Sequence, residues 1–225
     1  MIIDLGTQSL ESTFVQAIYQ ARSVGGGSFM STAASNWEMV ITKQKGKITL
    51  SLRGPETKVS PAPIPEDAEF FGIIFRHGTF MPNLPGCKLV DHEIHLPETV
   101  KNSFQLFGET WEFPNSENVD VFINRLTRND LLKQDPVVGD VLRGKTQDLS
   151  LRSVQRRFVQ VTGLTYKTIQ QIERAKQATA LLQSGVPISE TTHQVGYFDQ
   201  AHLTNSLRRF YGQTPAQIIQ SDDSA

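Results

Sequence analysis

The sequence has one cysteine, Cys87, among 225 residues, so no disulfide can form within the chain. It also has no apolar run approaching the ~18 residues that a membrane span requires. The opening residues Met1–Asp4 lack the basic flank and the apolar stretch of a signal peptide. These absences argue against a disulfide scaffold and a membrane partner, and we expect a soluble protein of the reducing cytoplasm.

Neither sign of charge is in excess, because 22 Lys and Arg stand against 23 Asp and Glu. The balance holds only for the whole chain, because two parts of it carry opposite net charges. Residues 1–142 carry 12 basic and 17 acidic residues, whereas residues 143–211 carry 10 basic and 4 acidic residues. A basic C-terminal stretch beside an acidic part indicates a nucleic-acid-binding module joined to another domain. A solvated, lysine-rich face on an ordinary domain gives the same counts, so charge alone leaves both readings open.

Residues 28–112 have the pattern of a β-rich domain. Residues 48–52 alternate between apolar and polar side chains, and the turn Lys45-Gly46-Lys47 separates them from the run 37–42, which predicts a hairpin. Short strands punctuated by glycine and proline are typical of a sandwich or a cupin-like barrel. Residues before 28 fit either a helix or a strand. Further strands are expected at 70–75, near 88–90 and within 104–111.

The pattern becomes helical after Pro114. Ser116 is the expected N-cap of a helix whose apolar residues from Val119 to Leu126 recur at i, i+3, i+4 and i+7. The fold class is therefore α+β, with a β-rich domain followed by an all-α domain. The expected parts are a sensing or interaction domain at 1–115, a connecting helix or linker at 116–134, and a helical domain at 135–220.

Two helices of the helical part match each other. The first is expected at 150–162, with Ser150 as its N-cap and Gly163 as its stop, and the second at 199–211, again ending at a glycine, Gly212. The spacing of apolar residues, arginine and glycine in the first helix is echoed in the second at an offset of 49 residues. The expected buried residues are Leu151, Val154, Phe158 and Val161 in the first helix and Leu203, Leu207 and Phe210 in the second.

Each of these helices has a shorter partner upstream. The partners are expected at 136–143 and 188–195, and Gly196-Tyr197 supplies the sharp turn of a helix-turn-helix. One long amphipathic helix over 169–182 lies between the two pairs and would fix their separation.

The motifs of the second pair are Gly196-Tyr197, Asp199-Gln200-Ala201-His202-Leu203 and the stretch from Arg208 to Pro215. Together with residues 149–158 and Gly163 in the first pair, and Arg174, Ala178, Leu181 and Leu182 in the long helix, they make residues 135–219 resemble the DNA-binding domain of AraC/XylS-type transcription factors. The resemblance implies two helix-turn-helix units on one rigid linker helix, with both recognition helices in successive major grooves about 34 Å apart. It implies a sequence-specific DNA-binding regulator of transcription.

The sequence departs from the family pattern in several places. The stretch 143–149 is longer and more polar than the usual turn, and asparagine stands at position 205 where the family carries arginine. Asparagine favours adenine where arginine favours guanine, so sequence preference is not transferable from a relative. The other departures are Leu207 in place of an aromatic residue, Thr191 and Thr192 in place of apolar and small residues, and Tyr166 in place of proline.

The resemblance implies two sets of DNA contacts. Arginine can bind guanine O6 and N7 together, and glutamine can pair with adenine N6 and N7. The base-contact candidates are Arg152, Gln155 and Arg156 in the first unit and Gln200, Ala201, His202 and Asn205 in the second. The candidates for phosphate contact, or for bracing the domain itself, are Lys145, Arg157, Lys167, Arg174, Arg208 and Arg209. The alternative for each is a solvated helix face.

The family often joins its DNA reader to an N-terminal ligand-sensing or dimerising domain. An apolar effector pocket could be lined by Trp37, Phe75, Phe80 and Trp111, although aromatic residues of a small β domain more often form its core. The expected partner is double-stranded DNA. RNA polymerase, a small-molecule effector and a second copy of the chain are further candidate partners, and no cofactor is expected.

The alternative function is a metal-dependent cupin-like enzyme with an appended helical module. Its ligands would come from His77, Asp91, His92, Glu93 and His95, yet alternate residues of 91–95 face opposite sides of any strand. Cys87 has no identifiable base partner, and Gly25–Gly27 is not followed by the lysine of a phosphate-binding loop. We therefore expect no metal site and no enzyme.

Overall fold

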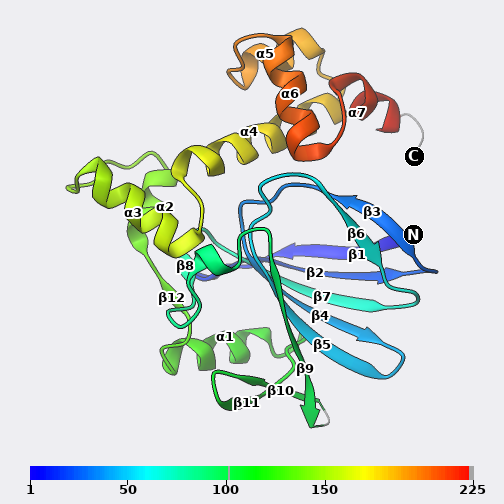
Figure 1. The fold of residues 1–225 in the computed structure, drawn as a ribbon, viewed down its shortest axis with the longest axis vertical. Coiled ribbons are helices and arrows are strands. Elements are labelled where there is room, and N and C mark those ends of the chain that lie inside the picture. The colour runs from blue at the N-terminus through cyan, green and yellow to red at the C-terminus, as the bar shows by residue number, and fades with distance from the viewer. Residues whose placement is uncertain (101, 223–225) are drawn as a thin grey trace. The chain divides into compact units, whose positions relative to one another are not determined.

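The computed structural model describes residues 1–100 and 102–222, in which strands fill the N-terminal part and helices the C-terminal part (Figure 1). The predicted order of a β-rich region followed by helices is confirmed. The strands are β1 Ile2–Ser9, β2 Val15–Ser23, β3 Gly27–Ser31, β4 Glu38–Gln44, β5 Lys47–Arg53, β6 Ser60–Ile64, β7 Glu69–Phe75, β8 Thr79–Phe80, β9 Glu93–Val100, β10 Ser103–Leu106, β11 Glu109–Glu112 and β12 Lys133–Gln134. The helices are η1 Gly86–Lys88, α1 Val119–Arg128, α2 Pro136–Leu142, α3 Leu151–Thr162, α4 Tyr166–Gln183, α5 Ile188–Gln194, α6 Gln200–Tyr211 and α7 Pro215–Asp222. Across the described ranges, no helix combines the length and apolar character needed to cross a membrane.

Eight strands form one antiparallel sheet in the order β1-β2-β7-β4-β5-β9-β10-β11. The predicted hairpin is its β4–β5 pair, and its turn residues Lys45 and Gly46 both have positive φ, at 48° and 76°, as a tight two-residue hairpin turn requires. The sheet ends at β1 on one side and β11 on the other.

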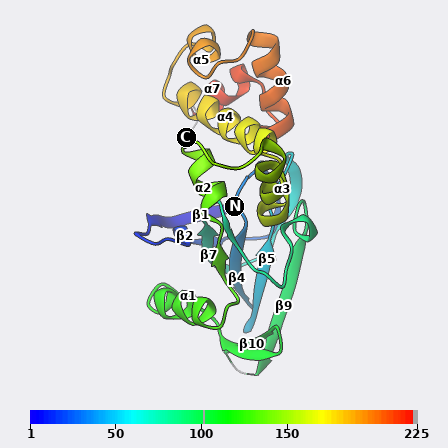
Figure 2. The same cartoon turned by 90° about the vertical axis from the view of Figure 1, so that its left-hand side faces the viewer.

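One face of this sheet carries the main apolar core. Alternate residues of the central strands, such as Met39, Leu50 and Ile73, are fully buried there. Helix α1 packs its stripe of Val119, Phe122, Ile123 and Leu126 against this cluster, and covers the sheet from that side (Figure 2). The predicted apolar period of α1 is therefore confirmed, although its N-cap is Asn118 and not Ser116.

Two details of the N-terminal part differ from the sequence prediction. The expected strand at 88–90 is instead the end of the short helix η1 and the turn after it. The next strand, β9, begins at Glu93, inside the polar stretch 91–95, where the sequence analysis expected no strand. Its residues Ile94 and Leu96 pack on the core while Glu93 and His95 point to the other face, so a strand with few apolar residues was hidden by its charges.

The chain divides into two compact units that do not follow the order of the sequence. The first comprises residues 1–28, 36–55 and 63–165, and so includes the sheet, α1, α2 and α3. The second comprises residues 29–35, 56–62 and 166–225, and so includes α4 to α7. The domain boundary expected at 116–134 remains a prediction.

In the second unit, two segments from the N-terminal half pack against the helices. The amide of Ala33 donates a hydrogen bond of 2.8 Å to the Phe210 carbonyl, and the amide of Val59 donates one of 3.0 Å to the Arg209 carbonyl. Both carbonyls belong to the last turn of α6, where a helix has no amides of its own to offer. Residues 29–35 and 56–62 thus complete the C-terminal end of α6.

Candidate nucleic-acid interface

The first candidate reading device is the pair α2 and α3. Asp135 caps α2 by accepting a hydrogen bond of 2.9 Å from the Val137 amide, and Pro136 fills the first helical position, where no amide is needed. The second oxygen of the same carboxylate accepts a 2.6 Å hydrogen bond from Arg157 of α3. One buried carboxylate therefore caps one helix and holds the other.

Helix α3 begins and ends where the sequence predicts. The Ser150 hydroxyl accepts from the Ser153 amide, and Gly163 stops the helix with φ of 76°. The predicted buried stripe is only partly correct, because Phe158 and Val161 are buried but Leu151 is 83% exposed. The buried residues all lie in the C-terminal half of α3, which packs against α2, β8 and η1, so the first turn projects into solvent.

The exposed face of α3 carries the three base-contact candidates of the first unit. Arg152, Gln155 and Arg156 are all exposed, and the helix contains no acidic residue. These three side chains are not buried within the protein. The arginine charges can bind phosphates, and the hydrogen-bonding groups of all three residues can bind base edges.

The second candidate device is the pair α5 and α6, which lie side by side next to α4 (Figure 1). Gly196 turns the chain between them with φ of 73°. Tyr197 then points inward, and its hydroxyl lies 2.8 Å from the Ser206 hydroxyl of α6. Burial raises the pKa of the Tyr197 phenol, which therefore stays neutral in its hydrogen bond.

The two threonines that depart from the family pattern are accommodated in α5. Thr191 and Thr192 are buried, and each hydroxyl donates to a backbone carbonyl, that of Val186 at 3.4 Å and that of Ile188 at 2.6 Å. Their polar atoms are therefore satisfied without a change of fold.

Helix α6 presents a polar face and buries the predicted apolar stripe. Asp199 caps it by accepting a 2.7 Å hydrogen bond from the His202 amide, and Gly212 ends it with φ of 73°. Leu203, Leu207 and Phe210 are buried as expected. The base-contact candidates on the exposed face are Gln200, Ala201, His202 and Asn205.

Three of the phosphate-contact candidates have polar partners within the protein. Arg157 is bound to Asp135, and the Lys145 ammonium lies 3.2 Å from Asp140. Arg174 donates to the Gly196 carbonyl and lies over the Tyr197 ring, so it braces the turn of the second unit. All of the six except Arg174 are exposed. Among them are Lys167, Arg208 and Arg209, the last with its guanidinium 5.0 Å from the Phe210 ring centroid.

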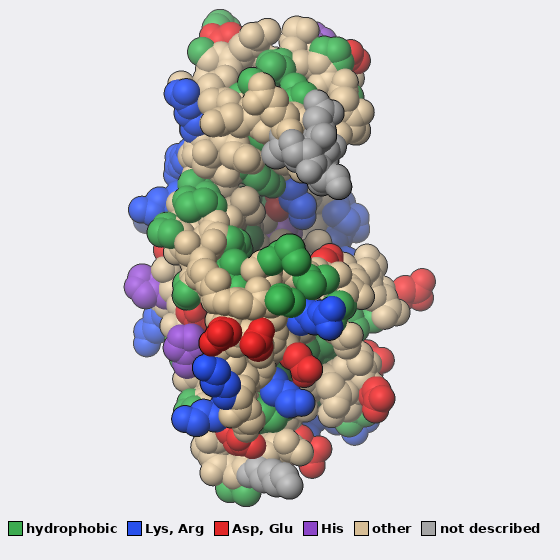
Figure 3. Space-filling model, turned by 90° about the vertical axis from the view of Figure 1, so that its right-hand side faces the viewer, with side chains coloured by type: hydrophobic (Ala, Val, Ile, Leu, Met, Phe, Trp, Pro, Cys, Tyr) green, Lys and Arg blue, Asp and Glu red, His purple; other side chains and the backbone are tan. Residues whose placement is uncertain are grey.

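The surface around the β4–β5 turn of the sheet carries charges of both signs. Seen from the side of the β4–β5 turn, acidic and basic side chains are interspersed (Figure 3). Lys43 lies 3.6 Å from Glu69, and Lys45 lies 3.5 Å from Glu66. Because the two signs alternate there, this surface lacks the uniform positive field that attracts a phosphate backbone.

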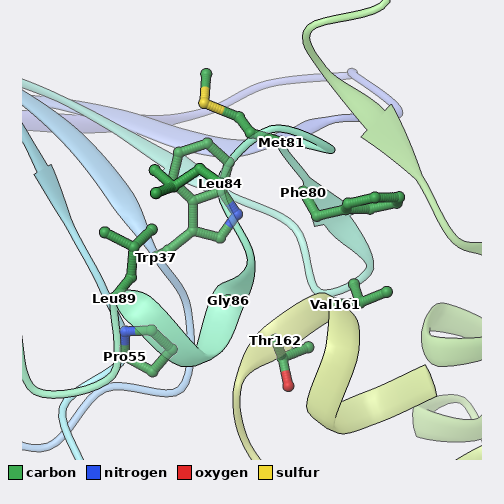
Figure 4. A pocket seen from close by; sticks show the side chains of 9 residues that line it. All are labelled: Trp37, Pro55, Phe80, Met81, Leu84, Gly86, Leu89, Val161 and Thr162. Atoms are coloured by element: carbon green, nitrogen blue, oxygen red, sulfur yellow. The ribbon is translucent and has the colours of Figure 1, made fainter. Parts of the chain in front are cut away.

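The four aromatic residues expected to line an effector pocket do not converge. Trp37 and Phe80 line an apolar pocket (Figure 4), and Phe75 stacks on Trp37 with ring centroids 3.9 Å apart. Trp111 instead belongs to the core beside α1, where the Arg125 guanidinium lies 4.2 Å from its ring centroid. The remaining lining residues are Pro55, Met81, Leu84, Gly86, Leu89, Val161 and Thr162.

Sequence reasoning missed that the end of α3 forms one wall of this pocket. Val161 and Thr162 face the loop that contains Gly86, and a Cβ placed on Gly86 would lie only 2.6 Å from the Gly163 nitrogen. The close approach of two glycines far apart in the sequence joins α3 to the loops of the sheet. No local pattern encodes that contact.

The residues of the enzyme alternative do not assemble into a site. Within residues 1–100 and 102–222, no group of three His, Cys, Asp or Glu side chains is placed to hold a metal ion. Glu93 is bound to Arg53 at 3.0 Å, and His95 meets Ser51 at 2.9 Å and Glu93 at 3.7 Å through the same Nδ1 atom. A relay from serine to carboxylate needs both ring nitrogens, so this cluster is not a hydrolase triad.

Comparison with known proteins finds a family model that matches most of the helical part. Residues 145–221 match the family model described as a helix-turn-helix domain, of the AraC type. The HTH-type transcriptional regulator VirS of Mycobacterium tuberculosis, in strains CDC 1551 / Oshkosh and ATCC 25618 / H37Rv, is 34% identical over 70 residues, which is 31% of this chain and 21% of that protein. The match thus spans about a fifth of the relative's length.

A solved structure is similar over a larger part of this chain, at a lower sequence identity. ToxT from Vibrio cholerae matches 90% of this chain and 97% of its own, with a TM-score of 0.41 and 9% sequence identity. The family match over 145–221 confirms the resemblance predicted for the helical part, and the matched relatives are transcription regulators.

Proposed function

We propose, from the premise that residues 145–221 are an AraC-type helix-turn-helix domain, that the chain is a sequence-specific DNA-binding regulator of transcription. The observation that carries this proposal is the structural similarity of α3 and α6. Each helix is capped at its start and stopped by a left-handed glycine. The exposed face carries arginine and glutamine in α3, and glutamine, histidine and asparagine in α6. Such a helix can lie in a major groove with its polar face against base edges.

In this proposal, different residues determine the affinity for DNA and the sequence specificity. Arg152, Gln155 and Arg156 on α3, and Gln200, Ala201, His202 and Asn205 on α6, would contact bases. Lys167, Arg208 and Arg209 would contact phosphates, because all three are exposed and basic. Phosphate contacts set affinity and its salt dependence, whereas base contacts set sequence preference. Arg157 and Arg174 would act inside the domain, since both have internal partners.

The N-terminal part would control the reader through a small-molecule effector or a protein contact. The pocket lined by Trp37 and Phe80 also includes Val161 and Thr162, so an apolar occupant would touch the sheet loops and the end of α3 together. We expect this protein to act in the cytoplasm and to perform no catalysis. Because one chain carries two reading helices, a second copy is not required for a two-groove footprint.

The test is a titration of the purified chain against duplex DNA at about 50 mM and about 200 mM salt, using genomic fragments enriched by the protein and a scrambled duplex of equal length. A regulator binds the enriched fragment more tightly than the scrambled one and loses more than about tenfold in affinity at the higher salt concentration. Equal affinity for both duplexes, or no binding at the lower salt concentration, would refute the proposal.

A further inference from the structure

Phe198 occupies an unusual position in the turn that leads into α6. Its side chain is 92% exposed, more than that of any other large apolar residue among residues 1–100 and 102–222. Scattered apolar residues on a surface are ordinary, but a phenyl ring this exposed at the start of a candidate reading helix leaves its apolar area free to be buried by a ligand.

The neighbours of Phe198 fix the direction of its side chain. Tyr197 on one side is buried, hydrogen-bonded to Ser206, and in edge-to-face contact with His202 at 5.1 Å between ring centroids. Asp199 on the other side holds the first turn of α6 through the His202 amide. With both neighbours anchored to α6, the ring between them is held outward at the N-terminal end of the helix.

The first unit has the same feature at the corresponding place. Leu149 and Leu151 flank the capping residue Ser150, and they are 39% and 83% exposed. Leu149 precedes its cap as Phe198 precedes Asp199. Both reading helices therefore begin with exposed apolar groups beside the cap, followed by their polar candidates.

We infer that Phe198 is a specificity-determining residue that contacts the C5 methyl group of a thymine in the major groove, an inference that rests on the proposed function. The N-terminal residues of a recognition helix are the ones that meet base edges. Of the groups that base pairs display in the major groove, the thymine methyl is the apolar one, and apolar side chains, phenylalanine among them, recognise it. The exposed Arg208 and Arg209 lie at the other end of α6, where they can bind phosphates and leave the N-terminal end to the bases.

The experiment removes the methyl group and the ring separately. Each thymine of a duplex selected by the protein is replaced in turn by deoxyuridine, which lacks only that methyl, and affinity is measured by fluorescence anisotropy. The wild-type chain is expected to lose about fourfold in affinity at one thymine, the scale of one buried methyl group. Phe198→Ala is expected to bind the thymine duplex more weakly and to bind the thymine and deoxyuridine duplexes equally.

Matched controls separate this contact from a change of fold. Val121 of α1 is also a strongly exposed apolar residue, and Val121→Ala is expected to keep both the affinity and the methyl sensitivity. The thermal unfolding of Phe198→Ala is expected to match that of the wild type, because the ring contacts little of the protein. The variant Phe198→Leu, which keeps an apolar group, is expected to retain part of the methyl sensitivity.

The outcomes distinguish this inference from the proposed function. If the wild type binds a preferred duplex but no thymine is methyl-sensitive, the inference is overturned and the proposed function stands. If Phe198→Ala loses the same affinity on both duplexes and stays methyl-sensitive, the ring contacts sugar or backbone and the inference is again overturned. A chain that binds no duplex overturns both.

Discussion

Arg157 of α3 and Asp135, the cap of α2, are joined by a hydrogen-bonded ion pair of 2.6 Å, so the guanidinium that the sequence offered to a phosphate is engaged within the protein. The Asp135 carboxylate is largely buried, whereas the Arg157 side chain is 44% exposed. We expect Arg157→Ala to lower the free energy of unfolding by about 1 kcal/mol, a value limited by solvent screening of the exposed partner. Urea unfolding measures the loss. The slope of DNA affinity against salt is expected to stay unchanged, and a slope reduced by one phosphate would show that Arg157 leaves Asp135 on binding.

Arg156 and Arg209 are expected to act differently on DNA. Arg156→Ala should cost about 1–3 kcal/mol on duplexes with one preferred base and relax the preference at that position. Arg209→Ala should weaken binding to all sequences alike and reduce the salt slope by about one contact. Anisotropy titrations over a set of single-base variants measure both effects. Lys43→Ala, on the mixed-charge surface, is the control and should change neither.

Asn205 should give the second unit a preference for adenine. The side chain is exposed in the middle of α6, and an amide can pair with adenine N6 and N7 together. Asn205→Ala should cost about 1–3 kcal/mol on the preferred duplex, and Asn205→Arg should move the preference at the same position towards guanine. A selection of random duplexes by each variant reads out the base. An unchanged preference in both variants would remove Asn205 from the interface.

Gly86 is expected to tolerate no side chain. A Cβ at this position would lie 2.6 Å from the Gly163 nitrogen and 2.8 Å from the Val161 carbonyl oxygen, both backbone atoms. We expect Gly86→Ala to destabilise the protein by about 1–3 kcal/mol through overpacking. Gly26→Ala is the matched control, since its nearest atom would be 3.7 Å away. Thermal unfolding compares the two, and equal melting temperatures would mean that the end of α3 can move away from the loop at little cost.

Glu93 should make the stability of the sheet sensitive to acid. Burial raises the pKa of its carboxyl, but hydrogen bonds from Ser51 and Arg53 and the charge of Arg53 outweigh burial and hold the pKa below its ordinary value of 4.5. A depressed pKa means that the ionised group stabilises the fold above its unfolded pKa, and that this contribution is lost as pH falls through the folded value.

The stability difference between the wild type and Glu93→Gln should therefore be largest near neutral pH and narrow below about pH 4.5. Urea unfolding at a series of pH values measures this difference in the free energy of unfolding. Glu112→Gln, on an exposed residue of β11, is the control and should follow the wild-type profile. A constant difference at every pH would mean that Glu93 acts through packing and not through its charge.

Local signals predicted most of the elements that carry the candidate interface. Ser150 and Gly163 mark the ends of α3, and Gly212 marks the end of α6, because caps and left-handed glycines act within a few residues of the chain. The β4–β5 hairpin was predicted for the same reason. The Asp135-Pro136 pair was an equally local signal for the start of α2. The ion pair of Asp135 with Arg157 is not local, because the two residues lie 22 positions apart.

Features that depend on distant contacts could not be predicted in this way. The period of α3 places Leu151 on the apolar stripe, but its side chain is 83% exposed. Strand β9 was missed because its residues pair with β5 residues that lie 40 to 48 positions away, while its charged side chains are typical of a loop. The parallel placement of α3 and α6 on a rigid linker remains a prediction, since it depends on how two compact units are joined.

The amides of Ala33 and Val59 close the final turn of α6 from far upstream in the sequence. A fragment that starts at residue 135 would contain every helix of the family domain and still lack these two donors. In such a fragment, the last carbonyls of α6 would have to accept hydrogen bonds from water. The fragment would also lack Val59, whose apolar side chain lies beside Gly212. We therefore expect truncation at residue 135 to yield a protein in which the C-terminal end of α6 frays.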